Sequence, residues 1–503
     1  MQFIIDIALS LIYFLLFLLL CAWSWRFWKM YINQKYLNSI NWVMLEIKLP
    51  REIFKSPYAT ETAITSLLQG GGVADWYARN FKGKLPIFSS LEIASIEGVV
   101  HFYVRIEKRF RPLVEANFYA QYPGIEIVEA DDYTKLIHYH HLTEDVSLWG
   151  VTYSLSQTWE PIDEDTGEKY PDPKDKEKKY KMPGDFFPIK TYNDYGLEKD
   201  PKEEFKIDPI TPLLEMMGSI GKGEHLWYQI ILQDEGVYND KKFPKFYVNE
   251  MNHKHMSLSD MVKNYKKSIR IASTKKKGEV ALDAEGNPKT KSSGKDADGN
   301  PIMVPVTYGT HKIEYKDEMK LTQDEKDDLE MVNKKLAKPL ALAVVRMMYV
   351  TKSEKFRADN IQNVLSAVKP FAGRNSFIPP NNTSPYDYPW QNFRNRRVPW
   401  RSEEMFEAYV EREGFYPHVP KRESLDSFED STFWGSSMKT RKIWRMLYEG
   451  FFYPFSHPHA DDAITLNVEE IATMWHLPGA VATTPSLPRI DSAKGVAPVN
   501  LPQ

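Results

Sequence analysis

Residues 88–106 read FSSLEIASIEGVVHFYVRI, and this stretch decides the expected fold. Its two halves, 88–95 and 99–106, are rich in β-branched and aromatic residues, which favour strands. Glu97-Gly98 stands between them and is a turn signal. The stretch therefore predicts a β-hairpin.

The segments on either side of this hairpin complete an ordered set. A strand at 42–47 and a helix at 58–68 precede it, and a helix at 111–121 and a strand at 125–129 follow it. The order βαββαβ is that of a ferredoxin-like domain, in which two helices cover one face of an antiparallel sheet. We expect the first such domain at 40–150.

A second βαββαβ order is predicted further along the chain. Its strands are expected at 187–192, 226–232, 340–349 and near 376–378, and its helices at 209–220 and 359–368. A long insertion would separate its middle strands. This insertion holds helices at 257–271 and 322–335 and a polar stretch at 273–305 that is either a hairpin or a mobile loop.

The region from Pro379 onward is richer in Pro, Asn, Trp, Tyr and Arg, and predicts helices at 404–414, 439–450 and 467–476. Asn467 suits the N-cap of the last of these. The predicted fold class is α+β. Its parts are an anchor at 1–30, a first ferredoxin-like domain at 40–150, a linker at 151–185, a second ferredoxin-like domain at 186–378 with the insertion 233–338, a mostly helical C-terminal region at 379–480, and a Pro- and Ala-rich tail at 481–503.

The anchor is predicted from residues 7–25, IALSLIYFLLFLLLCAWSW. The run has no charged residue and as a helix would cover about 28 Å, enough for one membrane span. A cleavable signal peptide would end in small residues instead of aromatic and basic ones. The residues expected at the membrane interface are Trp23, Trp25, Arg26, Trp28 and Lys29.

The distribution of charge around the anchor predicts its orientation. Asp6 precedes the apolar run, whereas Arg26, Lys29 and Lys35 follow it. The positive-inside rule therefore predicts a single-pass protein of the cell membrane with its bulk in the cytoplasm. Cys21 is the only cysteine and lies in the apolar run, so no intramolecular disulfide can form.

Net charge argues against a general affinity for polyanions. The chain of 503 residues carries 65 Lys and Arg against 68 Asp and Glu, a formal net charge of -3. Binding to nucleic acid or anionic lipid would therefore need a local basic patch.

The motifs of common enzymes are missing from the sequence. The nearest string to a phosphate-binding loop, GSIGKG at 218–223, has Met216 where the first Gly belongs and no hydroxyl after Lys222, so it predicts a helix-to-strand turn. A G-x-S-x-G nucleophile elbow is absent. We expect a protein that is not an enzyme and takes no cofactor.

Two groups of histidines are candidate zinc ligands. They are His138, His140 and His141, and His457 and His459 followed by Asp461 and Asp462. Neither group has a recognised ligand spacing, and no Cys is available to complete a structural site. We expect these to be polar strand and loop residues without a metal.

Aromatic and basic residues alternate between Tyr388 and Arg401, a mixture that suits nucleic-acid backbone and bases. The alternatives are packing between domains, a protein partner, or anionic lipid near the anchor. The residues singled out are Trp390, Arg394, Arg396, Arg397, Trp400 and Arg401, with a later basic group at Lys439, Arg441, Lys442 and Arg445.

One segment carries a family resemblance. Residues 466–479, LNVEEIATMWHLPG, followed by Pro488-Arg489-Ile490, Ser492-Ala493-Lys494 and PVNLP at 498–502, resemble a segment of membrane-anchored conjugation proteins. Those proteins belong to the HerA-like and type IV secretion coupling ATPase group, where the segment stands just ahead of the motor domain. The motor-proximal residues that the resemblance implies are Glu469, Glu470, Trp475, His476 and Pro478.

The resemblance implies a role beside a DNA-translocating motor. The sequence given reaches Gln503 without the family's P-loop, so ATPase activity is not carried over. The resemblance and the anchor predict a non-catalytic docking component of a conjugative or type IV secretion-like DNA transfer system. Its partners would be membrane lipid, a HerA-like ATPase in trans and other copies of itself.

Two alternatives remain open from the sequence. In the first, the chain is half of a split DNA-translocating ATPase. In the second, it is a membrane protein that binds DNA directly through the 388–401 patch.

Overall fold

The computed structural model describes most of the chain. The described residues are 2–50, 55–68, 75–140, 145–163, 166–171, 178–197, 208–234, 247–249, 254–256, 258–275, 290–295, 301–305, 312–316, 318–384, 397–415, 463–479 and 487–490. The chain forms two compact units. The sheet unit comprises residues 1–155, 189–243 and 338–503, and the insert unit comprises 156–188 and 244–337.

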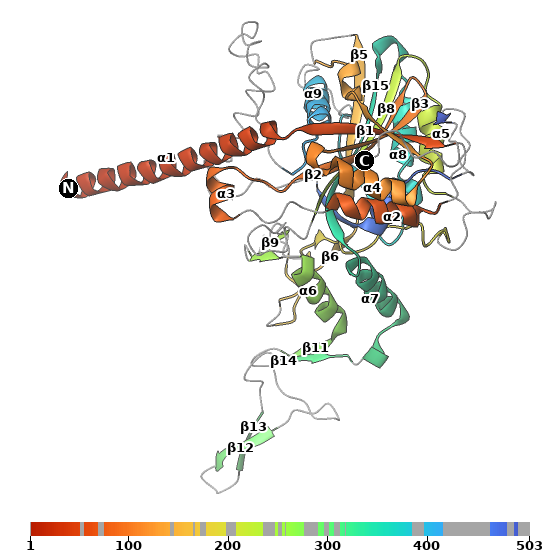
Figure 1. The fold of residues 1–503 in the computed structure, drawn as a ribbon. Helices are drawn as coiled ribbons and strands as arrows, with labels where there is room; N and C mark the ends of the chain where they lie inside the picture. The colour runs from red at the N-terminus through yellow and green to blue at the C-terminus, as the bar shows by residue number, and fades with distance from the viewer. Residues whose placement is uncertain are drawn as a thin grey trace. The chain divides into compact units, whose positions relative to one another are not determined.

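The sheet unit is α+β and begins with a long apolar helix, as the sequence predicts (Figure 1). Its strands form one large, mostly antiparallel sheet in place of the two separate sheets that were expected. Its helices are α1 (Gln2–Ser39), α2 (Pro57–Thr65), α3 (Trp76–Phe81), α4 (Arg111–Gln121), α5 (Thr211–Gly218), α8 (Asp359–Ser366), α9 (Arg397–Val410) and α11 (Val468–Met474). Its strands are β1 (Trp42–Pro50), β2 (Phe88–Ile96), β3 (Val99–Glu107), β4 (Glu126–Ala130), β5 (Val146–Leu155), β8 (Glu224–Asp234), β15 (Leu340–Lys352), β16 (Phe377–Asn382), β17 (Ile464–Asn467) and β18 (Arg489–Ile490).

Two sets of elements in the sheet unit share one topology. The first set runs β1-α2-β2-β3-α4-β4, and its strands pair in the order β4-β1-β3-β2. The second set runs β5-α5-β8-β15-α8-β16, and its strands pair in the corresponding order β16-β5-β15-β8. All of these pairs are antiparallel.

The two sets join edge to edge through β2 and β8. These strands pair antiparallel from Phe88 opposite Gln233 to Ile96 opposite His225. Glu92 opposite Gln229 is the middle pair, so the two sets meet as in a two-fold arrangement around this point. The expected strands of two separate domains therefore lie in one continuous sheet.

The two faces of the sheet have different covers. Side chains that alternate along the strands point to opposite faces, and Leu91 and Ile93 belong to the core cluster that includes residues of α2, α4, α5, α8 and α11. Ala94 belongs instead to a second cluster with Met405, Phe406 and Tyr409 of α9. Apolar residues are thus buried on both faces, which explains why β15 reads as a nearly continuous apolar run.

The prediction of a strand at 187–192 is wrong, because these residues form no strand. The second set begins instead with β5, and 189–192 is irregular backbone, two of whose N–H groups donate to side chains of α11. Ile189 N–H donates to Glu470 Oε1 at 2.9 Å, and Tyr192 N–H donates to Thr473 Oγ1 at 2.9 Å. Ile189 and Tyr192 are buried, which produced the strand-like pattern without a strand partner.

The segment 151–185, which was expected to be a linker, is divided between the two units. Residues 151–155 continue β5, and the stretch from Ser156 belongs to the insert unit. Trp159 and Met182 pair within the short strands β6 (Thr158–Trp159) and β7 (Met182–Pro183). The Pro- and Lys-rich composition of 151–185 is typical of a linker, so the pairing of β6 with β7 was not predicted.

The insert unit has its own small core. Its helices are α6 (Leu258–Arg270) and α7 (Gln323–Leu336), and its remaining strands are β9 (Tyr247–Asn249), β10 (Lys254–Met256), β11 (Ile271–Lys275), β12 (Thr290–Lys295), β13 (Pro301–Pro305) and β14 (Lys312–Tyr315). Tyr265 packs against Trp159, Phe186 and Phe187. The predicted hairpin at 273–305 has a counterpart in the antiparallel pair β12–β13.

Two glycines share a left-handed backbone conformation but differ in their surroundings, so a comparison of them probes the contact between the two sets. Gly98 in the β2–β3 turn and Gly196 both have positive φ, of 89° and 69°. An added Cβ on Gly98 would lie 2.6 Å from the carbonyl oxygen of Ile220 in the α5–β8 turn, whereas one on Gly196 would meet nothing within 4 Å.

We predict that Gly98→Ala destabilises the protein more than Gly196→Ala. Both variants incur the left-handed backbone cost of about 1 kcal/mol, but only Gly98→Ala also forces the two turns apart. Urea unfolding of each variant measures the difference. Equal losses would contradict the turn-to-turn contact of the two sets.

Candidate functional site

A row of polar side chains crosses the middle of the sheet. Cross-strand partners in register lie on the same face, so the row follows from the strand pairing. In strand order it comprises Glu46 on β1, Tyr103 on β3, Glu92 on β2, Gln229 on β8, Arg346 on β15 and Thr152 on β5. Glu92 and Gln229 are fully buried, so this row carries polar groups into the core.

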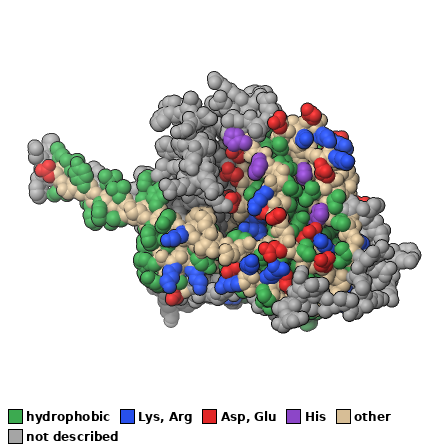
Figure 2. Space-filling view, turned by 45° about the horizontal axis from the view of Figure 1, so that its top comes forward, with side chains coloured by type: hydrophobic (Ala, Val, Ile, Leu, Met, Phe, Trp, Pro, Cys, Tyr) green, Lys and Arg blue, Asp and Glu red, His purple; other side chains and the backbone are tan. Residues whose placement is uncertain are grey.

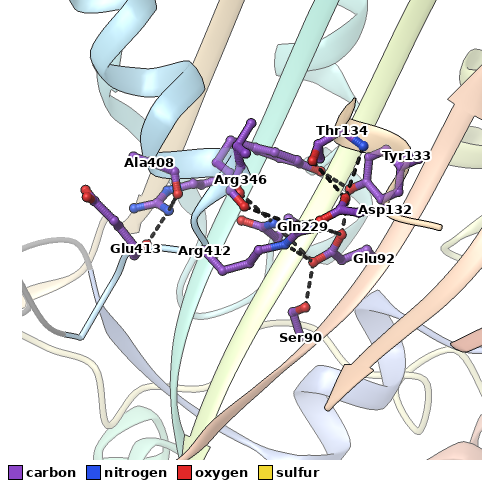
Figure 3. Close-up of polar contacts among 12 residues, drawn as sticks. Ser90, Glu92, Asp132, Tyr133, Thr134, Gln229, Arg346, Ala408, Arg412 and Glu413 are labelled. Carbon is purple, nitrogen blue, oxygen red and sulfur yellow. Dashed lines mark hydrogen bonds and ion pairs between the residues drawn. The ribbon is translucent and has the colours of Figure 1, made fainter. Parts of the chain in front are cut away.

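Arg412 reaches this row from the end of α9 (Figure 3). The N–H of Glu413 donates to the carbonyl of Ala408 and that of Arg412 to the carbonyl of Tyr409, which is the Schellman pattern of a helix C-terminus. Arg412 has a φ of 54° at the position where Gly is usual. A non-glycine residue is strained there, so other contacts must hold it.

Those contacts are ion pairs with Glu92 and Asp132. Arg412 donates from Nε and Nη2 to the two carboxylate oxygens of Glu92, each at 3.1 Å. It also donates from Nη1 and Nη2 to Asp132, at 2.6 and 3.0 Å. The side chains of Arg412 and Glu92 are 1% and 0% exposed, so this is a buried, doubly bidentate arrangement.

Burial and pairing act in opposite directions on these groups. Burial alone would raise the pKa of Glu92, but the charge and hydrogen bonds of Arg412 outweigh it and leave the pKa lowered. The same balance brings the pKa of Asp132 to about 2. For Arg412, burial would lower the pKa, and the two carboxylates raise it well above its ordinary value. All three groups are therefore charged at neutral pH.

Further donors complete the coordination of the Glu92 carboxylate. Ser90 Oγ donates to Oε1 at 2.5 Å, Gln229 Nε2 to the same oxygen at 3.2 Å, and Tyr133 Oη to Oε2 at 2.7 Å. Tyr133 also lies 2.9 Å from the hydroxyl of Tyr409 on α9. With its oxygens so engaged, Glu92 is suited to hold charge in place and poorly suited to take a proton from a substrate.

Arg346 donates to carbonyls at the C-terminus of α9 and just beyond it. Its Nη1 donates to the carbonyl of Ala408 at 3.0 Å and to that of Glu413, and its Nε donates to Thr152 Oγ1 at 3.3 Å. Gln229 Nε2 donates to the carbonyl of Tyr409 at 3.2 Å. A cation beside the carbonyls at the C-terminus of a helix is also favoured by the helix dipole.

The cluster therefore fastens α9 to the seam between the two sets. Its members come from β2, β8 and β15, from residues 132–133, and from the end of α9. The sequence reading missed this cluster. The available signal was a Glu, a Gln and an Arg, each in the middle of its strand between two apolar or aromatic residues.

The motor-proximal residues of the resemblance lie in the core of the sheet unit. Trp475 is fully buried, with edge contacts to Phe102 and Phe118 at ring-centre distances of 5.8 and 6.2 Å. Glu470 forms a capping box with Asn467, the predicted N-cap, and also accepts from Ile189 N–H. Pro478 is buried as well.

Glu469 and His476 each hold a buried or half-buried ion pair. Glu469 lies 2.8 Å from Lys338, which also contacts Glu61 of α2 at 2.8 Å. His476 Nε2 lies 3.0 Å from Asp208, and its Nδ1 lies 2.9 Å from the carbonyl of Ala472. Because both ring nitrogens face acceptors, the doubly protonated ring is favoured.

The other predicted site residues are placed as follows. Trp390, Arg394, Arg396, His141, His457, His459, Asp461, Asp462, Lys439, Arg441, Lys442 and Arg445 lie outside the described residues. Arg397 and Trp400 belong to the first turn of α9, and Arg401 follows, half-buried. His138 and His140 are exposed, and the described part of the chain has no group of three or more His, Cys, Asp or Glu residues that could hold a metal. Residues 219–223 form the turn between α5 and β8, as predicted.

The membrane-interface residues Trp23, Trp25, Arg26, Trp28 and Lys29 all lie in α1. Within the described residues, α1 is the one helix that is long and apolar enough to span a membrane. Comparison of the chain with protein-family models, with curated proteins and with solved structures finds no match.

We predict that removing the charge of Arg412 destabilises the protein strongly. Arg412→Gly suits the left-handed turn, so its cost reports the lost ion pairs, and an unpaired buried carboxylate costs about 3–5 kcal/mol. Adding Glu92→Gln should recover part of the loss. Chemical unfolding measures each step.

The control is the exposed pair of Lys334 and Glu330, whose side chains are 74% and 66% exposed. Lys334→Met should change stability by less than about 1 kcal/mol. A loss for Arg412→Gly as small as that of the control would show that the cluster does not fasten α9.

The His476–Asp208 pair predicts a dependence of stability on pH. Burial would lower the pKa of His476, but Asp208 outweighs it and raises the pKa, while the pKa of Asp208 is lowered. Because the pKa of His476 is higher in the folded protein, the protonated ring stabilises the fold. This stabilisation is complete below the unfolded pKa of about 6.5 and is lost as the pH rises through the folded pKa. The lowered Asp208 pKa adds stability above about pH 3.9 that is lost on acidification.

His476→Gln should flatten the decline in the free energy of unfolding on the alkaline side, where a titrating histidine contributes up to about 1.4 kcal/mol per pH unit. The exposed His138→Gln is the control and should leave the curve unchanged. A wild-type curve that His476→Gln does not alter would contradict the charged pair.

Proposed function

We propose that this protein is a membrane-anchored docking component without catalytic activity of its own. The observation that carries the proposal is the junction of α1 with the sheet. α1 ends at Ser39 and β1 begins at Trp42, so the apolar helix runs almost directly into a strand of the sheet unit. A helix attached in this way holds the whole sheet at a set distance from the bilayer.

Packing near the junction supports a stiff connection. Ile32 is 5% exposed, and Leu37 and Trp42 pack with the cluster that contains Phe88. An anchor that served only to tether the chain would need no such packing. The anchor would span the cell membrane once, with the bulk of the chain in the cytoplasm.

The buried charges support a structural role for the core. In the cluster around Glu92, carboxylates, guanidinium groups and hydroxyls are engaged with one another and hold α9. Such an arrangement fixes a surface rather than exposing a reactive group. We infer further that each of the two sets is a ferredoxin-like repeat, on the basis of their shared order of elements and strands.

The resemblance of residues 466–502 supplies the system in which such a component would act. We propose a conjugative or type IV secretion-like DNA transfer apparatus, in which the chain self-associates and recruits a HerA-like ATPase in trans. Because 466–479 lies in the core of the sheet unit, docking would use a folded surface close to α11 and α2.

Site-directed labelling tests the anchorage and its orientation. In a Cys21→Ser background, Thr62→Cys on the exposed side of α2 should react with a membrane-impermeant maleimide only after cells are opened. The unaltered chain, whose only thiol is Cys21, should stay unlabelled in both conditions because the bilayer covers it. Labelling of Thr62→Cys in intact cells would contradict the cytoplasmic placement.

Purification from solubilised membranes tests the partner. The tagged full chain should bring down an ATPase with a HerA-like P-loop domain, and that ATPase, tagged in turn, should bring down the chain. An unrelated single-pass membrane protein carrying the same tag is the control. Recovery of the chain alone as a monomer would count against the proposed role.

A further inference from the structure

The helix α3 presents an unusual aromatic surface. Trp76, Tyr77 and Phe81 are 63%, 56% and 42% exposed. Their rings cluster, with Tyr77 stacked on Phe81 at 5.3 Å and Trp76 tilted against it at 5.6 Å. Contiguous exposed apolar surface on a folded protein marks an interaction site.

Direct contacts join α3 to α1. Trp25 meets Phe81 edge-on at 6.1 Å, and Trp28 Nε1 donates to the carbonyl of Asn80 at 3.1 Å. Gly83, just after α3, has a φ of 66°, and an added Cβ there would lie 2.2 Å from the carbonyl oxygen of Ile32. The aromatic surface of α3 is therefore held beside the part of α1 where the apolar run ends.

Most of the charges around this surface are basic, and Asp75 at the N-cap of α3 is an acidic exception. Lys82 and Lys84 are exposed, and Lys82 Nζ lies 5.7 Å from the centre of the Tyr77 ring. Lys29 on α1 and Arg79 on α3 are near enough to repel each other. In Figure 2, hydrophobic side chains follow α1 to its base, where they meet Lys and Arg side chains. Aromatic rings beside cations are the composition of a surface that rests at a bilayer interface.

We propose that α3 is a second membrane contact, in which Trp76, Tyr77 and Phe81 enter the headgroup layer of the bilayer that α1 spans. Lys82 and Lys84 then face the phosphates of anionic lipids. The occupant is lipid because the surface is continuous with the aromatic end of the membrane helix. The inference rests on the proposed anchorage and adds to it: a single span leaves the protein free to rotate about the helix axis, and a second contact stops that rotation.

A fluorescent probe on α3 tests this contact in the full chain. In the Cys21→Ser background, Tyr77→Cys is labelled with an environment-sensitive fluorophore, and the protein is reconstituted into vesicles of phosphatidylcholine and phosphatidylglycerol. Tyr58→Cys on α2 is the matched control, because Tyr58 is also a tyrosine of a helix and is 58% exposed. Spin label on the lipid headgroups and iodide in the water serve as quenchers.

The expected result is a blue-shifted probe at position 77 that the headgroup spin label quenches and iodide does not, with the reverse at position 58. Replacing phosphatidylglycerol by phosphatidylcholine should reduce the shift at position 77. Lys82→Glu with Lys84→Glu should reduce it to the same extent in the anionic vesicles.

Each contrary result has a distinct meaning. Equal quenching by iodide at both positions, in protein that floats with the vesicles, overturns the α3 contact and leaves the anchor intact. Protection from iodide without quenching by the lipid label shows that protein covers α3, and also overturns the proposal. Failure of the chain to float overturns the anchorage and this contact together.

Discussion

The pairing of β2 with β8 is the interaction on which the rest of the structure depends. It makes one sheet of two sets that otherwise have the same internal order, and it places Glu92 opposite Gln229 at their meeting point. A carboxylate buried at that seam is costly unless it is paired. Arg412 supplies the pair from the end of α9, so the covering helix and the seam stabilise each other.

Much of this fold follows from sequence patterns, and the errors have local causes. The hairpin at 88–106 and the N-cap at Asn467 were predictable because strand-favouring residues, turn residues and N-cap residues are local signals. The strand expected at 187–192 failed because burial of Ile189 comes from contact with α11, whose residues lie far along the chain. β2 and β8 pair instead of remaining the edges of two domains. The two strands are far apart in the chain, and local sequence patterns do not predict such a long-range pairing.

The charge cluster was harder to predict than the fold. Glu92 and Arg412 are 320 residues apart, and neither belongs to a known motif. Arg412 also stands in a run of charged residues, Glu411 to Glu413, that resembles an exposed surface. The segment 466–479 was singled out from the sequence by its resemblance, but its burial in the core was not predicted. Because the segment is buried, its residues stabilise the fold in addition to any part they take in docking.

Amide hydrogen exchange, resolved by segment, tests most directly whether the two sets are one cooperative structure. If the β2–β8 seam unites them, the amides of β2, β3, β8 and β15 exchange through a common opening with the same free energy, and Arg412→Gly lowers that free energy for all four strands together. Exchange of β8 and β15 while β2 and β3 stay protected would show that the two sets open independently, and would contradict the account.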